Sequence, residues 1–233
     1  MNLWADFLTN DDLMMHKWTH YFPIYERHFS RFRNLDVTIL EIGVCHGGSF
    51  KMWKRFFGPF AKLVGIDINP FCIHAADEQC NVRIGSQTDP VFLDKIIEEF
   101  GIPDIVIDDG SHVMDHVNFT FDHLYPKLLK NSVYLVEDMH TAYWSEWGGG
   151  LGKADTFIEK SKKLIDQLNA DHSRGALAPN DFTRTTSSMH FYDSVIVFEK
   201  QSLRKKYDLC IGRELVEPGA SSQKITTATH PGS

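Results

Sequence analysis

The sequence is poor in cysteine, has no long apolar run and carries no excess of basic residues. Only 4 of its 233 residues are cysteines and they form no CxxC pair, so we expect a reducing compartment and no disulfide framework. We expect packing roles rather than a catalytic one for Cys45, Cys72, Cys80 and Cys210. No apolar run approaches the roughly 20 residues of a bilayer-spanning helix. The first residues, MNLWADFLTNDD, also lack the basic start and apolar middle of a secretory signal, which favours a cytoplasmic location.

The shortage of basic residues also limits the partners of the chain. It has 24 lysines and arginines against 31 aspartates and glutamates, a net charge of −7 at pH 7. Because nucleic-acid binding needs a basic face and no lysine or arginine stripe is present, we expect no nucleic-acid partner, and we expect no membrane partner either. The apolar content of 42% is enough for the core of one ordinary globular domain.

Short apolar runs alternate with helix-like stretches from about residue 37, which is typical of an α/β protein with a parallel sheet covered on both faces. Nearly every residue in these runs is apolar, as expected for strands buried on both faces. The predicted strands are 37–42, 63–66, 82–84, 105–107 and 133–136. Residues 189–192 and 195–198 flank a two-residue turn and predict a closing β-hairpin.

Helix start signals lie between the strands. Asp89 before Pro90 and Asn69 before Pro70 each combine a capping side chain with a proline at the first helical position. Apolar side chains recur every three or four residues after His112, which predicts an amphipathic helix of about four turns. A second apolar stripe predicts another helix; it consists of Phe157, Ser161, Leu164, Ile165 and Leu168.

The predicted elements divide the chain into segments. We expect residues 1–36 to form an N-terminal helical segment that closes the ligand-binding site described below, and residues 37–200 to form the α/β domain. Residues 140–152 (HTAYWSEWGGGLG) fit no regular element, so we predict a mobile loop at the start of a lid insertion over 140–187. Residues 201–233 form a C-terminal extension that is polar and predicted to be disordered from about residue 214.

A glycine-rich turn follows the first predicted strand. Gly43, Gly47 and Ser49 lie between this strand and a helical stretch, where backbone amides can approach a ligand closely. The spacing matches neither a P-loop nor G-x-G-x-x-G. Glu41 would repel a pyrophosphate but attract an ammonium group, and Asp67, at the end of the second strand, can accept from ribose hydroxyls. This set favours S-adenosylmethionine over NAD; the alternative is a tight turn with Asp67 as a helix cap.

Gln87 and Asp108 complete the predicted cofactor site. Gln87 follows the third strand, where its amide can bond to an adenine edge. The alternative is a turn residue beside the Asp89 cap. Asp108, the first acid of DDGSH, is expected to lie nearer the cofactor than its neighbour Asp109.

Carboxylates also end the fourth and fifth predicted strands. Asp109, Glu137 and Asp138 should meet at the carboxyl edge of the sheet, near the glycine turn. Such a cluster needs a cation, and oxygen ligands indicate Mg²⁺, with Mn²⁺ and Ca²⁺ as alternatives. The alternative role for these acids is helix capping, for which Asp109 and Ser111 are placed.

His112 is the candidate catalytic residue. It lies three residues after Asp109 at the start of a predicted helix, where it can face the same crevice and take up a proton near neutral pH. We expect it to act as general base, removing the proton of a hydroxyl group whose pKa the metal lowers. A purely structural histidine is the alternative.

These segments together resemble a known family. LEIGVCHGGS, GIDIN, GSQTD, VIDDGSH and VEDMHTAYW are similar to segments of the metal-dependent class I S-adenosylmethionine methyltransferases of the macrolide-sugar type, such as macrocin and mycinamicin O-methyltransferases. The similarity runs from about His16 to SMHFYDSVIVFEK, and VIDDGSH and VEDMHTAYW are its most specific parts. It implies a Rossmann-like, seven-stranded, mostly parallel sheet with an antiparallel last strand.

The resemblance also implies an activity, namely transfer of a methyl group from S-adenosylmethionine to a small-molecule hydroxyl such as that of a natural-product sugar in antibiotic biosynthesis. It places Glu41, Gly43, Ser49, Asp67 and Gln87 at the cofactor, Asp109, Glu137 and Asp138 at Mg²⁺, and His112 as the base. Some relatives are tetramers, so a homo-oligomer stays open.

Two other functions fit the same fold. A nucleotide-cofactor oxidoreductase would share it, but Glu41 in the glycine turn disfavours a pyrophosphate. A non-catalytic cofactor-binding paralogue would have lost a metal acid or the base, and neither is missing here.

Aromatic residues flank the predicted site on both sides. Tyr143, Trp144 and Trp147 in the predicted lid can stack on a sugar or a flat ring, or form a hydrophobic plug. On the other side, the N-terminal segment offers Trp18, His20 and Tyr21, either to close the site or to pack against the sheet as an amphipathic helix.

Overall fold

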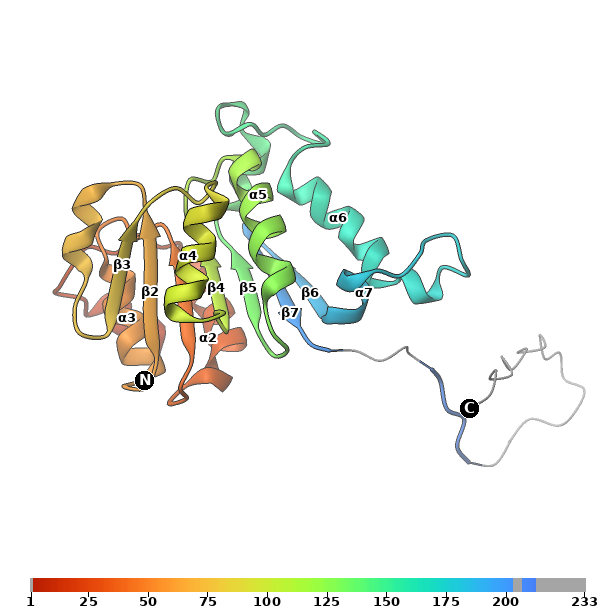
Figure 1. The fold of residues 1–233 in the computed structure, drawn as a ribbon, viewed down its shortest axis with the longest axis horizontal. Coiled ribbons are helices and arrows are strands. Elements are labelled where there is room, and N and C mark those ends of the chain that lie inside the picture. Colours follow the sequence, from red (N-terminus) through yellow and green to blue (C-terminus); the bar gives the residue numbers. More distant parts are fainter. Residues whose placement is uncertain (1, 203–206, 213–233) are drawn as a thin grey trace, which may run out of the picture.

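A seven-stranded sheet in the order β3-β2-β1-β4-β5-β7-β6 forms the centre of the molecule (Figure 1). The computed structural model describes residues 2–202 and 207–212. The strands are β1 Thr38–Ile42, β2 Lys62–Asp67, β3 Cys80–Ile84, β4 Ile105–Asp108, β5 Val133–Val136, β6 Thr186–Tyr192 and β7 Val195–Lys200. All neighbouring pairs are parallel except β5–β7 and β6–β7. The predicted strands, the closing hairpin and the antiparallel last strand are therefore confirmed.

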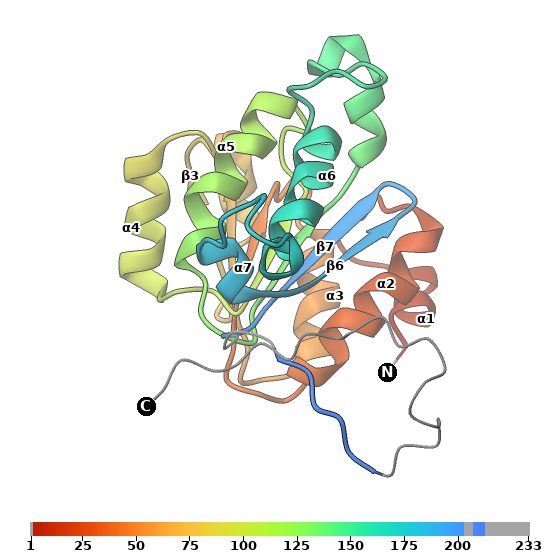
Figure 2. The same cartoon turned by 90° about the vertical axis from the view of Figure 1, so that its right-hand side faces the viewer.

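Helices cover both faces of the sheet (Figure 2). They are α1 Leu3–Leu8, α2 Phe22–Phe29, α3 Gly48–Phe57, α4 Pro90–Phe100, α5 Met114–Leu124, α6 Phe157–Leu168 and α7 Asp181–Thr185. On one face Tyr25 of α2 and Trp53 of α3 pack in one apolar core. On the other face Phe121 of α5 and Phe157 of α6 pack with Phe198 of β7 in a second core. Strands between two apolar layers are mostly apolar, and β4 and β5 are buried at every residue.

Two of the predicted helices differ from expectation in extent or type. Asp89 accepts hydrogen bonds from the amides of Val91 and Phe92 and caps α4 as predicted. Asn69 likewise caps the next segment, but η3 (Pro70–Ala75) is a 3₁₀ helix. The helix after His112 ends at Leu124 and continues as the 3₁₀ helix η4 (Tyr125–Lys127), because Pro126 cannot donate in an α-helix.

The segment 140–152 does contain regular structure, so that expectation was wrong. Two 3₁₀ helices, η5 (Met139–Tyr143) and η6 (Ser145–Trp147), occupy most of it. The glycines that follow fold back onto them, with the amide of Gly149 2.8 Å from the carbonyl oxygen of Trp144. A Cβ on Gly149 would lie 2.5 Å from the Thr141 carbonyl oxygen, so only glycine allows this close return.

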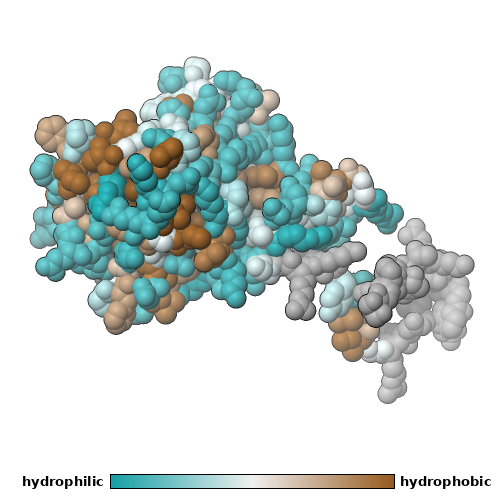
Figure 3. All heavy atoms as spheres, viewed as in Figure 1, coloured by the Kyte–Doolittle hydropathy of each residue, from teal (hydrophilic) through white to brown (hydrophobic). Residues whose placement is uncertain are grey.

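The cysteines and the surface complete the description. Cys72 and Cys80 are buried as packing residues, whereas Cys45 and Cys210 are exposed, so the packing expectation holds for two of the four. Apolar surface lies at the left-hand end of the view in Figure 3, where η3 projects. Among the described residues no helix is both long and apolar enough to cross a membrane. The predicted tail disorder concerns residues outside the described ranges.

Candidate active site

The glycine turn after β1 brings three separate segments into contact. Gly43 has φ +92°, and a Cβ there would lie 2.1 Å from the carbonyl oxygen of Asp109, so the end of β4 packs directly on the turn. Gly47, with φ +81°, immediately precedes α3. A Cβ on Gly48 would lie 2.5 Å from the carbonyl oxygens of Leu13 and Met14. The turn is therefore the meeting point of β1, β4 and the N-terminal segment.

Two cavities adjoin at this turn. One, of about 250 Å³, is lined by the N-terminal residues Met14–Lys17, by the glycine turn with Ser49, and by Asp109, His112 and Asp138. The other, of about 180 Å³, is lined by residues such as Ile66, Ile68, Gln87 and Ser111. Gly43, Asp67 and Gly110 line both cavities. Together they form one elongated space along the carboxyl edge of the sheet.

Asp67 links the two cavities to the glycine turn. Its Oδ2 accepts from the amides of Val44 (2.9 Å) and Cys45 (3.0 Å), and its Oδ1 accepts from the amide of Asn69 (2.8 Å). The helix cap after β2 is Asn69 rather than Asp67. Asp67 thus shapes the turn while its carboxylate borders both cavities.

Glu41 lies beneath the turn rather than in the cavity. Its side chain is buried and accepts from Ser49 Oγ (2.9 Å) and Trp53 Nε1 (3.3 Å). Burial raises the pKa of Glu41 to about 7, against the opposing charge of Lys17. Ser49, not Glu41, lines the cavity, so the cofactor contact of Glu41 stays a prediction.

Gln87 and Asp108 form a buried network at the end of β3 and β4. The Gln87 amide donates to Thr120 Oγ1 (3.0 Å) and Asp108 Oδ1 (3.3 Å) and accepts from the Ser111 amide (2.8 Å). Asp108 also accepts from Tyr134 OH, and burial raises the pKa of Asp108 to about 7. Gln87 borders the smaller cavity, but its polar atoms are already bonded within the protein. Asp108 borders neither cavity, because it bonds to Gln87 and Tyr134, and its predicted cofactor contact stays a prediction.

The three predicted metal acids come together at the ends of β4 and β5, each bonded to the N-terminal segment. Lys17 Nζ lies 2.5 Å from Asp109 Oδ2 and 2.9 Å from Glu137 Oε2. Tyr25 OH donates to Glu137 Oε1 (2.8 Å). Tyr21 OH donates to Asp138 Oδ1 (2.7 Å). We call these four bonded atoms the inner oxygens.

The remaining two carboxylate oxygens, Asp109 Oδ1 and Asp138 Oδ2, are the outer oxygens. They lie 3.9 Å and 3.6 Å from His112 Nε2. Asp109, His112 and Asp138 each offer an atom within 4.8 Å of the others, and all three side chains are partly exposed to the larger cavity. Two carboxylate oxygens beside open space suit a hard divalent cation such as Mg²⁺.

Charge in this cluster is only partly compensated. Burial by itself lowers the pKa of Lys17, but the charges of Asp109 and Glu137 outweigh burial and hold that pKa well above its usual range. Burial, together with the charge of Asp109, raises the pKa of Glu137. Glu137 is fully bonded through its inner oxygens, so it reaches a metal only by sharing an oxygen with Lys17 or Tyr25.

The backbone is strained where these side chains emerge. His112 (φ +57°), Asp138 (φ +53°) and Cys45 (φ +50°) have left-handed conformations that are rare outside glycine. Such strain persists only where surrounding contacts impose it, and it concentrates at functional sites. Neither Asp109 nor Ser111 caps α5, whose N-cap is Val113, so the capping alternative does not account for them.

Aromatic residues surround the opening. The ring of Trp147 contacts that of His112, with centroids 5.9 Å apart. Tyr143 and Trp144 are about half exposed, and His140 lies between Trp144 and Trp18. A third cavity, of about 400 Å³, extends from Met139 and His140 to α6 and the β6–β7 turn. Its lining is largely apolar: Met139, Tyr143, Ile158, Ile165, Phe191 and Ile196.

A second histidine cluster lies away from this site, on β6 and β7 beside α2. His28, His190 and Glu199 also offer atoms within 4.8 Å of one another. However, both nitrogens of His28 are bonded, to Glu199 and to Tyr192, and Glu199 also pairs with Arg31. These groups already satisfy one another and need no cation.

Sequence reasoning missed Lys17 and Tyr25 and left Tyr21 undecided. The three side chains recur at intervals of four, Lys17, Tyr21 and Tyr25, within HKWTHYFPIY. Tyr21 and Tyr25 lie one helical turn apart, in η1 (Thr19–Tyr21) and α2, and a polar pair on an otherwise apolar face is the signal that could have identified them. Lys17 precedes both helices, so the spacing gives no such signal for it.

Known proteins resemble this chain over most of its length. Demethylmacrocin O-methyltransferase of Streptomyces fradiae is 36% identical over 199 residues, which are 79% of this chain and 50% of that protein. Mycinamicin VI 2''-O-methyltransferase of Micromonospora griseorubida is 38% identical over 197 residues, 78% of this chain and 48% of that protein. The chain thus spans about half the length of these relatives. No family model matches it.

A solved structure gives the same result. The MycE methyltransferase of the mycinamycin biosynthetic pathway, in complex with Mg, S-adenosylhomocysteine and mycinamycin VI, is 35% identical and superposes with a TM-score of 0.74. The match covers 86% of this chain and 53% of that one.

Proposed function

The chain belongs to the macrolide-sugar O-methyltransferase family, and from that premise we propose that it transfers a methyl group from S-adenosylmethionine to a hydroxyl group of a glycosylated small molecule, with Mg²⁺. The observation that carries the proposal is the position of two outer carboxylate oxygens and a histidine at the larger of two adjoining cavities. Membership of this family replaces the oxidoreductase alternative.

The elongated cavity would hold the cofactor, which supplies the methyl group when bound. Its larger part, between Met14–Lys17 and the glycine turn, would take the amino-acid half of the cofactor. The negative charge of Glu41, which lies behind Ser49, would attract the ammonium group of that half. Its smaller part, lined by Ile66 and Ile68, would take the adenine. Asp67, at the junction, would accept from the ribose hydroxyls.

Asp109 and Asp138 would hold Mg²⁺ through the outer oxygens, with Glu137 as the third acid. When bound, the metal would lower the pKa of an acceptor hydroxyl. Relatives of this type include proteins named for sugar hydroxyls, such as an 8-demethyl-8-alpha-L-rhamnosyl tetracenomycin-C 2'-O-methyltransferase. We therefore propose a glycoside acceptor whose sugar lies over these oxygens.

His112 would act as the base. Its Nε2 faces the outer oxygens, so a proton taken from the acceptor hydroxyl would leave an imidazolium beside two carboxylates that stabilise it. The left-handed backbone at His112 aims the ring back toward β5, and Trp147 packs against the ring. The bound cofactor would supply the methyl group, and His112 and the metal acids would hold the acceptor oxygen in a fixed position for the transfer.

Binding and turnover test this function. Isothermal titration calorimetry should detect binding of S-adenosylhomocysteine to the protein and no binding of NAD. A panel of desmethyl glycosides with S-adenosylmethionine should give a methylated sugar that disappears with chelator and returns with Mg²⁺. Absence of S-adenosylhomocysteine binding, or methylation that chelator does not change, would contradict the proposal.

From the sequence we also propose the domain boundaries given above, a homo-oligomeric state and a cytoplasmic location.

A further inference from the structure

We propose that Lys17 is a positioning residue for the metal acids: with Tyr21 and Tyr25 it holds the inner oxygens so that the outer oxygens stay turned toward His112. The inference rests on the proposed function, because it concerns the same acids. It goes further by assigning the orientation of the metal ligands to the N-terminal segment, which precedes the α/β domain in sequence.

Lys17 is placed as a fixed cation. Its side chain is only 3% exposed, and its ammonium group bridges Asp109, which follows β4, and Glu137, which follows β5. A buried ammonium group is tolerated only when anions and hydrogen bonds replace its water. The same contacts restrain both carboxylates, which come from different strands.

The two tyrosines complete the arrangement. Tyr21 donates to Asp138, and the Asp138 amide in turn donates to Tyr21 OH at 3.3 Å. Tyr25 takes the Glu137 oxygen that Lys17 does not reach. Every inner oxygen therefore has one donor from residues 17–25, and neither outer oxygen has one. When one oxygen of a carboxylate is hydrogen-bonded and the other is not, the bonded oxygen fixes the orientation of the group, as supporting hydrogen bonds do for ligands in known metal sites.

The charges indicate that Lys17 stays in place when the metal binds. Asp109, Glu137 and Asp138 carry three negative charges, which one divalent cation and one lysine together neutralise. Displacing Lys17 would leave Glu137, 1% exposed, with less compensation than it has now.

The backbone before Lys17 is also held. The carbonyl groups of Leu13 and Met14 lie so close to Gly48 that no Cβ fits there. The ammonium group is therefore delivered from a segment that packs directly on the glycine turn, which makes Lys17 a poor candidate for a mobile competitor of the metal.

Mn²⁺ affinity tests the inference directly, without turnover. Free Mn²⁺ is measured by electron paramagnetic resonance in the wild type, in Lys17→Met and in Lys51→Met, a lysine whose partner Asp77 lies outside the metal site. Loss of supporting contacts typically weakens metal binding by 10–100-fold, so Lys17→Met should lose about that much and Lys51→Met nothing. Unchanged or tighter Mn²⁺ binding in Lys17→Met overturns the inference; tighter binding would identify Lys17 as a competitor.

If Lys17→Met does not fold, two conservative tyrosine-to-phenylalanine variants test the same inference. Tyr21→Phe removes one donor to Asp138 and keeps the ring, so Mn²⁺ affinity should fall several-fold. Tyr134→Phe removes a buried hydroxyl that serves Asp108 instead, and it should leave Mn²⁺ affinity unchanged. Equal affinities in the two variants contradict the inference.

Chemical rescue separates positioning from a general structural role. Lys17→Ala removes three methylene groups and the ammonium group, so n-propylammonium should restore Mn²⁺ affinity while n-butanol should not. Absence of rescue in folded protein counts against the inference. A wild type that binds no Mn²⁺ would instead contradict the metal part of the proposed function, so the two failures are distinct.

Discussion

Nε2 of His112 lies 3.6 Å from Oδ2 of Asp138, although the two residues follow different strands and are far apart in the sequence. Both have left-handed backbones, with φ of +57° and +53°. Parallel strands end at one edge of a sheet, and the two unusual turns direct an imidazole and a carboxylate into the same opening.

Replacing His112 by Ala should reduce kcat by about 10²-fold or more, because general-base catalysis contributes that much. S-adenosylhomocysteine affinity should change little, since the ring faces the acids. His123→Ala is the control, because His123 of α5 pairs with Asp94 of α4 and lines neither cavity of the site. Steady-state kinetics with calorimetry measures both quantities; unchanged kcat in His112→Ala would remove its role as base.

Mg²⁺ should stabilise the folded protein. A ligand present at one hundred times its Kd raises the free energy of unfolding by about 2.7 kcal/mol when it binds only the native state. Asp109→Asn and Asp138→Asn should lose this gain, because each removes the charge of an outer oxygen. Asp122→Asn, on the surface with Lys160, should keep it. Thermal unfolding with and without Mg²⁺ measures this stabilisation. An equal increase of Tm in the wild type and all three variants would show that Mg²⁺ binds elsewhere.

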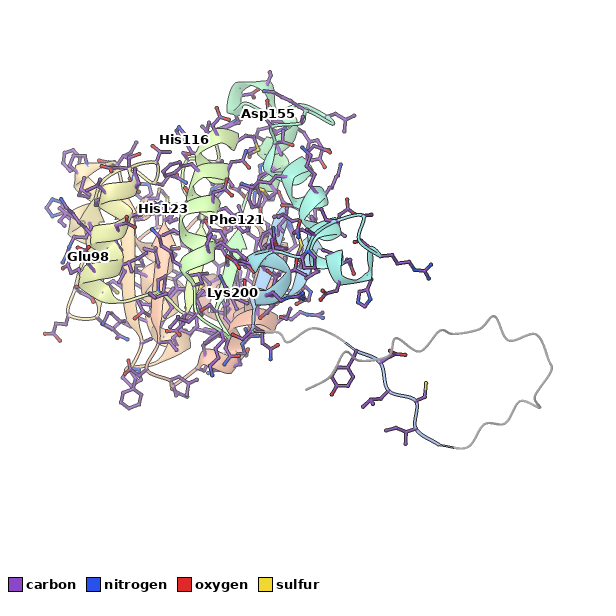
Figure 4. The ribbon with its side chains drawn as sticks, turned by 45° about the vertical axis from the view of Figure 1, so that its right-hand side comes forward. Glu98, His116, Phe121, His123, Asp155 and Lys200 are labelled. Atoms are coloured by element: carbon purple, nitrogen blue, oxygen red, sulfur yellow. The ribbon has the colours of Figure 1, made fainter. Side chains whose placement is uncertain are left out.

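Gly48→Ala should destabilise the protein by about 1–3 kcal/mol, the usual effect of overpacking. A Cβ at this helical position meets two backbone carbonyl oxygens at 2.5 Å. The N-terminal segment must move away, so S-adenosylhomocysteine affinity should fall as well. Glu98→Ala, on the exposed face of α4 (Figure 4), is the comparison. Urea unfolding measures the free energy of unfolding, and calorimetry measures S-adenosylhomocysteine affinity. If both are the same in Gly48→Ala and the wild type, the N-terminal segment does not pack closely on Gly48.

Lys200 should make stability rise with pH in alkaline solution. It lies at the end of β7 (Figure 4), and its ammonium group donates to the carbonyl groups of Tyr125 and Pro126. Burial lowers the pKa of Lys200 to about 8 in the folded state. Between that pKa and the higher one of the unfolded chain, the unfolded state binds more protons, so the free energy of unfolding contributed by this group increases with pH.

Lys200→Met removes that contribution. The difference in unfolding free energy between wild type and Lys200→Met should therefore grow from pH 7.5 to 9.5 in favour of the wild type, as measured by urea denaturation. Lys130→Met, at an exposed position, should show no such growth. A constant difference for Lys200→Met would mean that the lysine is not desolvated.

Much of the fold was predictable because the relevant interactions are local or periodic. Apolar runs specified the strands, and the Asp89 and Asn69 caps specified where the next segments begin. Local patterns failed where tertiary contacts or proline intervened. Pro126 shortened α5, and backbone contacts between Gly149 and Thr141 organised a segment whose composition indicated a loop.

The candidate site was predictable in position but not in orientation. Asp109, Glu137 and Asp138 follow strands, and sheet topology brings strand ends together. The sequence assigned Asp109 to the metal and Asp108 to the cofactor side, but it did not show which groups each side chain would meet, and successive residues at a strand end face opposite sides. One side chain consequently joins Gln87 and Tyr134 in a buried network, and the other faces the cavity.

The sequence by itself determined the α/β class, the glycine turn and the gathering of acids at one edge, because strand periodicity and parallel connections leave few other arrangements. Only the tertiary structure decided which oxygens of those acids stay open. Lys17 determines this, because it bonds to Asp109, 92 positions later in the sequence, and to Glu137, 120 positions later. A charge partner at that separation leaves no local pattern, since chain folding alone brings the two together.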